Sequence, residues 1–217
     1  MAIQFFDCKG FGQLEMSQSW AYRAGQVEAQ CKLDPEKFAA HFPMTPAEAS
    51  DNKIYAEVGA FLMVDKANKI ATVPTAALSA KGFPMGINYS TEKIYNQFTP
   101  GRRNFAMIAG EFLPRIGYMD PGMRICTNTV AWDESYFEAD AEDDDTPSVQ
   151  LWKNVQEDLA SGTTVYAFVT AASNGKLVIG APLADAIGNV YTQVTEAYYN
   201  ADNTLSFKFQ FINKPAA

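Results

Sequence analysis

Residues 163–180, TTVYAFVTAASNGKLVIG, and 190–212, VYTQVTEAYYNADNTLSFKFQFI, decide the fold of this chain. In the first stretch, Asn174-Gly175 separates two runs rich in β-branched and aromatic residues, and this pair is favoured where a tight turn needs positive φ. In the second, F-K-F-Q-F alternates aromatic and polar side chains, as in a strand with one buried face. The two stretches predict two consecutive β-hairpins and therefore favour a β-barrel or β-sandwich.

Further strands are expected upstream of these hairpins. Alternating apolar and polar residues indicate a half-exposed strand at 26–33. Apolar runs bounded by turn residues indicate a hairpin of strands 54–64 and 69–73, and more strands within 105–132. The chain is therefore expected to be mainly β.

One short α-helix is expected near residues 148–160. Apolar residues recur there at helical spacing, and Gly162 follows as a stop signal. The apolar positions are Leu151, Trp152, Val155 and Leu159.

Composition and turn residues indicate how the chain is organised. With 217 residues and 47% hydrophobic content, it can bury one good core or two small ones. Residues 1–19 show no period and predict an extended N-terminal arm, whereas residues 20–217 predict a single, mainly β domain. Within that domain we expect a loop-rich excursion from the sheet at 79–104 and an acidic loop at 133–147.

The arm supplies the candidate interaction residues. An isolated apolar arm is costly to leave in water, so it is expected to pack on a neighbouring subunit and not on its own domain. An ordinary edge segment of the same core is the alternative. The candidate residues are Phe5, Phe6, Phe11, Leu14 and Met16.

The net charge of −8 is concentrated in the acidic loop. Eight of the 25 acids lie between residues 133 and 145, which leaves 17 acids against 17 bases elsewhere. This balance argues against a broad nucleic-acid or membrane-binding face, and no apolar run is long enough to span a membrane. The tract 140–145 has three interpretations: a solvated loop, a docking site for a basic partner, or a calcium site without EF-hand spacing.

No residue is expected to be catalytic, and no metal or cofactor is expected. The one histidine, His41, has no nucleophile motif to act with, and no glycine-rich phosphate-binding motif occurs. A glycosidase with two carboxylates brought together in space stays open as an alternative. Its candidate acids are Glu111, Asp120, Glu134 and Glu196.

The cysteines and the N-terminal sequence predict a compartment. Cys8, Cys31 and Cys126 are odd in number and distant in sequence, so they form neither a disulfide framework nor a zinc cluster. The first residues lack the basic and apolar regions of a secretory signal. Both observations favour assembly in a reducing cytoplasm.

The run GTTVYAFVTAASNGKLVIGAP, then GNVYTQVTEAYY and the closing FKFQF, resembles the C-terminal end of small capsid decoration (cement) proteins of tailed bacteriophages. In such proteins a Gly-Thr opens a strand, Asn-Gly or Asp-Gly turns it, and a short Ala-Pro loop leads to the next strand. The resemblance covers about a quarter of the chain. It is a pattern of strands and turns without a diagnostic residue.

The resemblance implies a structural virion protein, assembled in the host cytoplasm, that decorates and stabilises a phage capsid. Its implied partner is the major capsid protein, and its implied state is a homo-oligomer, with a trimer favoured. Residues 1–60 and 79–104 exceed a minimal cement protein and are expected to bind a fibre or another decoration protein. The alternative function is a receptor-binding or adhesion module of a phage tail or surface fibre.

Overall fold

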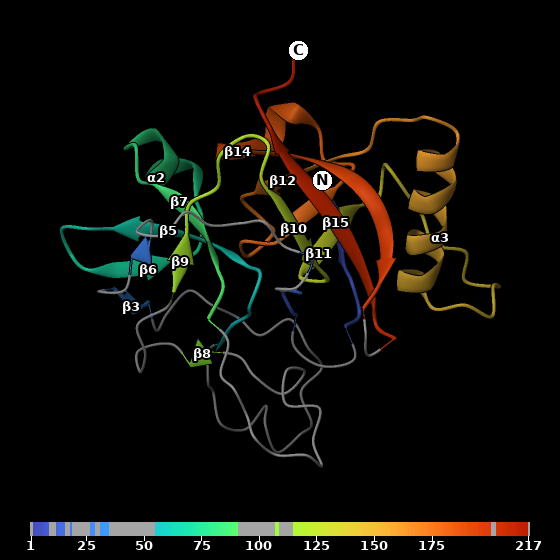
Figure 1. Ribbon diagram of the computed structural model, residues 1–217, viewed down its shortest axis with the longest axis horizontal. Helices are drawn as coiled ribbons and strands as arrows, with labels where there is room; N and C mark the ends of the chain where they lie inside the picture. The colour runs from blue at the N-terminus through green and yellow to red at the C-terminus, as the bar shows by residue number, and fades with distance from the viewer. Residues whose placement is uncertain are drawn as a thin grey trace.

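A computed structural model gives the fold (Figure 1). The prediction of a mainly β fold with little helix is confirmed, because the described chain forms a seven-stranded and a six-stranded sheet and only two α-helices. A third, two-stranded sheet pairs β4 (Tyr55–Ala56) with β8 (Met107–Ile108). The residues described are 2–8, 12–15, 18, 27–28, 31–34, 55–90, 107–108, 115–200 and 203–216.

The seven-stranded sheet contains both C-terminal hairpins. In spatial order its strands are β1 (Ile3–Phe5), β11 (Val130–Asp133), β13 (Leu177–Ile179), β12 (Tyr166–Thr170), β14 (Ala186–Tyr199), β15 (Leu205–Ile212) and β10 (Arg124–Thr127). All neighbouring pairs are antiparallel except β11 and β13, which are parallel. The two predicted hairpins are therefore confirmed, and their four strands lie side by side.

The turn and the alternation that predicted these hairpins both occur in the structure. Asn174 and Gly175 have φ of 50° and 82°, the positive values that the pair favours. Along β15, Phe207, Phe209 and Phe211 are at most 3% exposed and face the core. Burying each of these rings stabilises the fold by about 1.5–3 kcal/mol.

The six-stranded sheet packs against the seven-stranded one. Its order is β2 (Val27–Glu28), β9 (Ile116–Gly117), β7 (Met85–Asn88), β5 (Phe61–Asp65), β6 (Ile70–Thr72) and β3 (Lys32–Leu33). β5 is buried on both faces, because Phe61 and Met63 join the core shared with the larger sheet while Leu62 and Val64 join a second cluster. The shared core makes the two sheets a sandwich.

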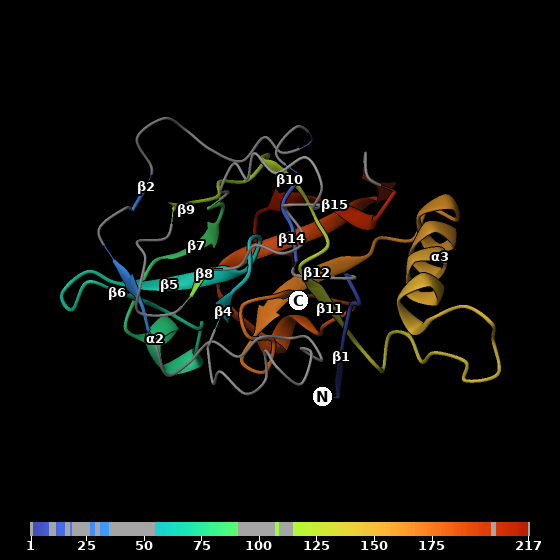
Figure 2. The ribbon, with the colours of Figure 1, turned by 90° about the horizontal axis from the view of Figure 1, so that it is seen from below.

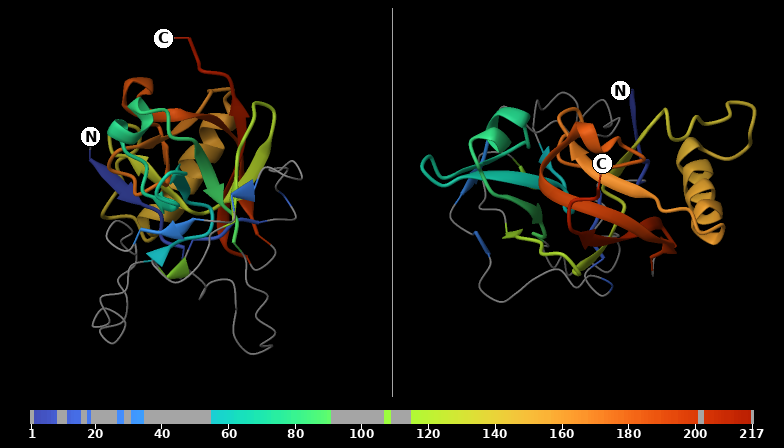
Figure 3. Two further views of the ribbon diagram at one scale, coloured as in Figure 1. Left: turned by 90° about the vertical axis from the view of Figure 1, so that its left-hand side faces the viewer. Right: turned by 90° about the horizontal axis from the view of Figure 1, so that it is seen from above.

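Two helices flank the sheets at opposite ends of the molecule (Figures 1 and 2). α3 (Pro147–Ala160) has the predicted position and buries Leu151, Trp152 and Val155 against β14 and β15. α2 (Ala76–Ala80) contacts the other end of β14, where the backbone N–H of Gly188 donates to Ser79 Oγ at 3.0 Å. A short 3-10 helix, η2 (Leu183–Asp185), precedes β14. The long, curved β14 thus connects the two ends of the fold (Figure 3).

The structure corrects three predicted elements. Residues 26–33 form two short strands, β2 and β3, at opposite edges of the six-stranded sheet. The predicted strand 54–64 is interrupted after β4, because Glu57 is buried and Gly59 takes a φ of 91°. The described part of the predicted excursion at 79–104, residues 79–90, contains the end of α2 and the sheet strand β7. The rest of that segment lies outside the described residues.

Candidate functional site

The N-terminal segment belongs to the core of its own domain at the positions described. Phe6 is 1% exposed and meets Phe207 edge-on, with ring centroids 5.3 Å apart, and Leu14 is 2% exposed. Phe5 lies half-buried in β1, which pairs with β11. The prediction that these residues pack on a neighbour instead of their own domain is therefore wrong for Phe6 and Leu14. The other two candidates, Phe11 and Met16, lie outside the described residues.

A layer of buried polar residues lies where the two sheets and the N-terminal segment meet. Thr127, Asn128 and Thr129, between β10 and β11, are all 0% exposed. Thr127 Oγ1 donates to the backbone oxygen of Gln13 at 2.6 Å, and Thr129 Oγ1 donates to that of Val58. We call this layer the polar junction; its residues are Gly12, Gln13, Glu57, Val58, Thr127, Asn128, Thr129 and Lys176.

Close approach of three chain segments explains the glycines of the junction. A Cβ on Gly12 would lie 2.2 Å from Thr129 Oγ1, and one on Gly59 would lie 2.5 Å from Thr127 Oγ1. Real Cβ atoms do not come so close to another heavy atom. Glycine at these positions is what lets the threonine hydroxyls reach the backbone oxygens of Gln13 and Val58.

The junction contains a buried ion pair. Lys176 and Glu57 are 2% and 4% exposed, and the Lys176 Nζ contacts Glu57 Oε2. Glu57 Oε1 accepts a hydrogen bond of 3.1 Å from the backbone N–H of Gly12. Burying two charges is favourable only when their mutual attraction and further hydrogen bonds offset the lost hydration, so each partner depends on the other.

The cysteines are thiols, as the sequence predicts, and all three are buried. Burial raises the pKa of Cys8 far above its ordinary value, although the nearby Lys176 charge acts in the opposite direction. Burial also raises the pKa of Cys126 to about 11, against the hydrogen bond from Ser206 that lowers it. Both thiols are therefore protonated and unreactive near neutral pH.

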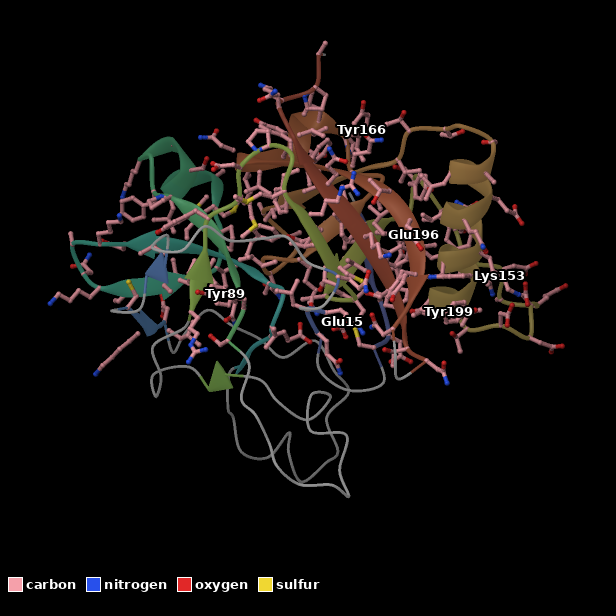
Figure 4. All side chains as sticks on the ribbon, in the orientation of Figure 1. Glu15, Tyr89, Lys153, Tyr166, Glu196 and Tyr199 are labelled. Atoms are coloured by element: carbon pink, nitrogen blue, oxygen red, sulfur yellow. The ribbon has the colours of Figure 1, made fainter. Side chains whose placement is uncertain are left out.

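An exposed tyrosine surface lies where α3 meets the end of the β14–β15 hairpin (Figure 4). Tyr199 is 56% exposed, and its ring packs on Trp152 with centroids 4.7 Å apart. On the other face of the hairpin, Lys208 Nζ lies 3.9 Å from the centre of the Tyr198 ring and 2.8 Å from Glu196 Oε2. Tyrosine is enriched at the centre of protein interfaces, whereas charged groups lie at their rim.

The acidic loop is held by α3. The Gln150 side chain accepts from the backbone N–H of Asp140 at 2.8 Å and donates to the backbone oxygens of Asp140 and Asp145. Lys153 pairs with Asp145. The carboxylates of Asp140 and Asp143 accept from backbone N–H groups two residues further on, at 2.9 Å each. The loop therefore has a defined shape beside the tyrosine surface.

The remaining candidates from the sequence have local partners or lie outside the described residues. Glu196 pairs with Lys208, and Glu134 accepts from Gln4. His41 and Glu111 lie outside the description. Across the described ranges, no cluster of three or more His, Cys, Asp or Glu side chains is placed to hold a metal ion. Neither described α-helix has the length and apolarity needed to cross a membrane.

Sequence reasoning missed the polar junction. Its members come from four segments far apart in the chain, and most are polar residues in loops or at strand ends, which the sequence alone predicts to be solvent-exposed. One signal was present: Glu57 and Lys176 each stand beside runs of apolar residues. Comparison of the chain with protein-family models, curated proteins and solved structures finds no match.

Proposed function

We propose that the chain is a structural virion protein that decorates a tailed-bacteriophage capsid by binding its major capsid protein. The observation that carries the proposal is the strand-and-turn pattern of residues 162–211, which resembles capsid decoration proteins. These residues supply β12 to β15, four neighbouring strands of the seven-stranded sheet. The proposed homo-oligomer, a trimer, and contacts with a fibre or a second decoration protein belong to the same proposal.

The tyrosine surface is the proposed contact with the capsid. It combines an exposed aromatic ring, Tyr199, with charges of both signs from Lys153 and Asp145. The ring rests on Trp152, so little conformational entropy is lost when a partner covers it. The neighbouring acidic loop offers negative charge for steering toward a basic patch.

Cosedimentation with capsids assembled without this chain tests the proposal. We expect the purified protein to pellet with such capsids to saturation. Replacing Tyr199→Ala should weaken binding at least about tenfold, the usual loss at a central interface tyrosine. The matched control is Lys81→Ala, an exposed residue after α2 at the other end of the molecule, which should bind normally.

Two results would contradict the proposal. Protein that stays in the supernatant at every concentration excludes capsid decoration, and binding to host cells instead supports the adhesion alternative. If the Tyr199→Ala protein binds capsids with full affinity, the capsid contact lies on another surface. Light scattering after size-exclusion chromatography tests the trimer, whose mass would be three times the 23.8 kDa of one chain.

A further inference from the structure

Three buried donors of the polar junction have no hydrogen-bond partner. They are Lys176 Nζ, Asn128 Nδ2 and Gln13 Nε2. Lys176 Nζ contacts the Glu57 carboxylate as an ion pair but without the geometry of a hydrogen bond. Folded proteins satisfy most buried donors, because an unpaired one loses its hydration without gaining a partner. Three of them in one layer call for an explanation.

Lys176 and Asn128 come just before two strands that pair with each other. β11 pairs in parallel with β13, with Val130 opposite Leu177, so Lys176 precedes this pair by one residue and Asn128 by two. Cys8 places both residues in one cluster. Its thiol donates to the backbone oxygen of Asn128 at 3.0 Å, and Lys176 is the strongest charge acting on it.

The Asn128 carboxamide is held through its oxygen. Its Oδ1 accepts a 2.7 Å hydrogen bond from the backbone N–H of Gln13, and only the oxygen can accept there. This fixes Nδ2 as the end without a partner. A backbone N–H on the carbonyl oxygen also stabilises negative charge that develops on that oxygen, as in an oxyanion hole.

Glu57 stands where a proton-transfer group is needed. One carboxylate oxygen accepts from Gly12 N–H, and the other contacts Lys176 Nζ. Gly12 and Gln13 are consecutive, so adjacent backbone amides hold Glu57 and Asn128. The Glu57 carboxylate is therefore in direct contact with the lysine nitrogen.

We propose that Lys176 and Asn128 form an intramolecular isopeptide bond, with Glu57 as the catalytic acid and base. The Lys176 Nζ lone pair attacks Asn128 Cγ, the C–N bond to Nδ2 breaks, and Nδ2 leaves as ammonia. Glu57 accepts one proton from Nζ, passes it to the leaving nitrogen and then accepts the second Nζ proton, so the new amide nitrogen keeps one hydrogen, Glu57 ends protonated, and the step needs no oxidant, metal or second substrate. Both groups that react are donors without a partner, so the bond removes two of the three.

Intact-mass measurement of the denatured protein tests this bond. We expect the wild-type mass to be one ammonia below the sequence mass, after allowing for the state of Met1. Trypsin should yield the peptide 125–153 joined to 154–208, with cleavage blocked at Lys176. A wild-type protein with the full sequence mass and cleavage after Lys176 overturns the proposal.

Variants separate this bond from other losses of ammonia. Lys176→Met, Asn128→Ala and Glu57→Gln should each restore the full mass, whereas Lys153→Met, which removes a surface ion pair, should keep the loss. If the ammonia loss persists in Lys176→Met, it comes from another site, such as a succinimide formed at Asn174-Gly175. That result overturns the proposal. The wild-type peptide map decides the question even where a variant fails to fold.

Discussion

The core face of the C-terminal hairpins and the polar junction are both buried, but they are stabilised in opposite ways. Along β15, burial removes aromatic rings from water, and the stabilisation grows with the area buried. In the junction, burial dehydrates Glu57, Asn128 and Lys176, so stability depends on whether each polar group finds a partner. In the hairpins, the stability lost on truncating a side chain should therefore scale with the apolar area removed. In the junction, removing one polar group also leaves its partner buried and unpaired, so the loss of stability should exceed the contribution of the removed group.

Truncating a core ring of the hairpin should have the largest effect. Phe207→Ala removes a fully buried ring that contacts both Phe6 and Phe209, so we expect a loss of about 3–5 kcal/mol in the free energy of unfolding. Urea denaturation measures it. The control, Gln210→Ala on the outer face of the same strand, should change stability by less than about 0.5 kcal/mol. Equal losses at the two positions would contradict the assigned faces of β15.

Gly175 lies in the turn of the first hairpin and next to Lys176 of the polar junction. Substituting it therefore tests the contact between the two regions. Its backbone oxygen accepts from Phe61 N–H at 2.7 Å, and a Cβ would lie 2.2 Å from Phe61 O. We expect Gly175→Ala to lower the free energy of unfolding by about 2–4 kcal/mol, because the added methyl group overpacks the site and because alanine is strained at a φ of 82°.

Gly122 is the matched control for this change. It has a similar φ of 92°, but a Cβ there would meet nothing within 4 Å. Gly122→Ala should therefore lower the free energy of unfolding only through backbone strain, by about 1–2 kcal/mol. Urea denaturation measures this loss. If the two variants lose the same stability, the close approach of the sheets at Gly175 contributes nothing.

The smallest effect is expected at a turn that resembles neither region, the exposed turn between β5 and β6. Hydrogen bonds from the backbone N–H of Asn68 and, to a lesser extent, from its side chain hold the pKa of Asp65 below its ordinary value. A carboxylate with a lowered folded pKa stabilises the fold at neutral pH, and this stabilisation is lost as pH falls through that pKa.

Melting curves against pH check this prediction. Asp65→Ala should melt slightly below the wild type at pH 7, and the gap should close in acid, below the folded pKa of Asp65. Asp65→Asn keeps an acceptor without the charge, so it separates the two contributions. A gap that stays constant as the pH is lowered would rule out titration of Asp65 as its source.

Much of the fold was predictable because its signals are local. The spacing of Leu151, Trp152 and Val155 predicted α3, and Asn174-Gly175 predicted the turn between β12 and β13. Alternation over a few residues placed the β15 rings on the buried face. Each of these patterns depends on neighbours within a turn or a strand, which chain order already contains.

The polar junction and the position of the N-terminal segment were decided only by tertiary structure. Gln13 meets Asn128 across 115 residues of sequence, and Gly12 meets Glu57 across 45. No periodicity links such positions, and a polar residue in a loop reads as exposed until another segment covers it. Phe6 was likewise read as part of an arm, because the strands that bury it come more than a hundred residues later. Local patterning determines which apolar residues are buried, whereas packing of distant segments determines where polar residues can be buried and paired.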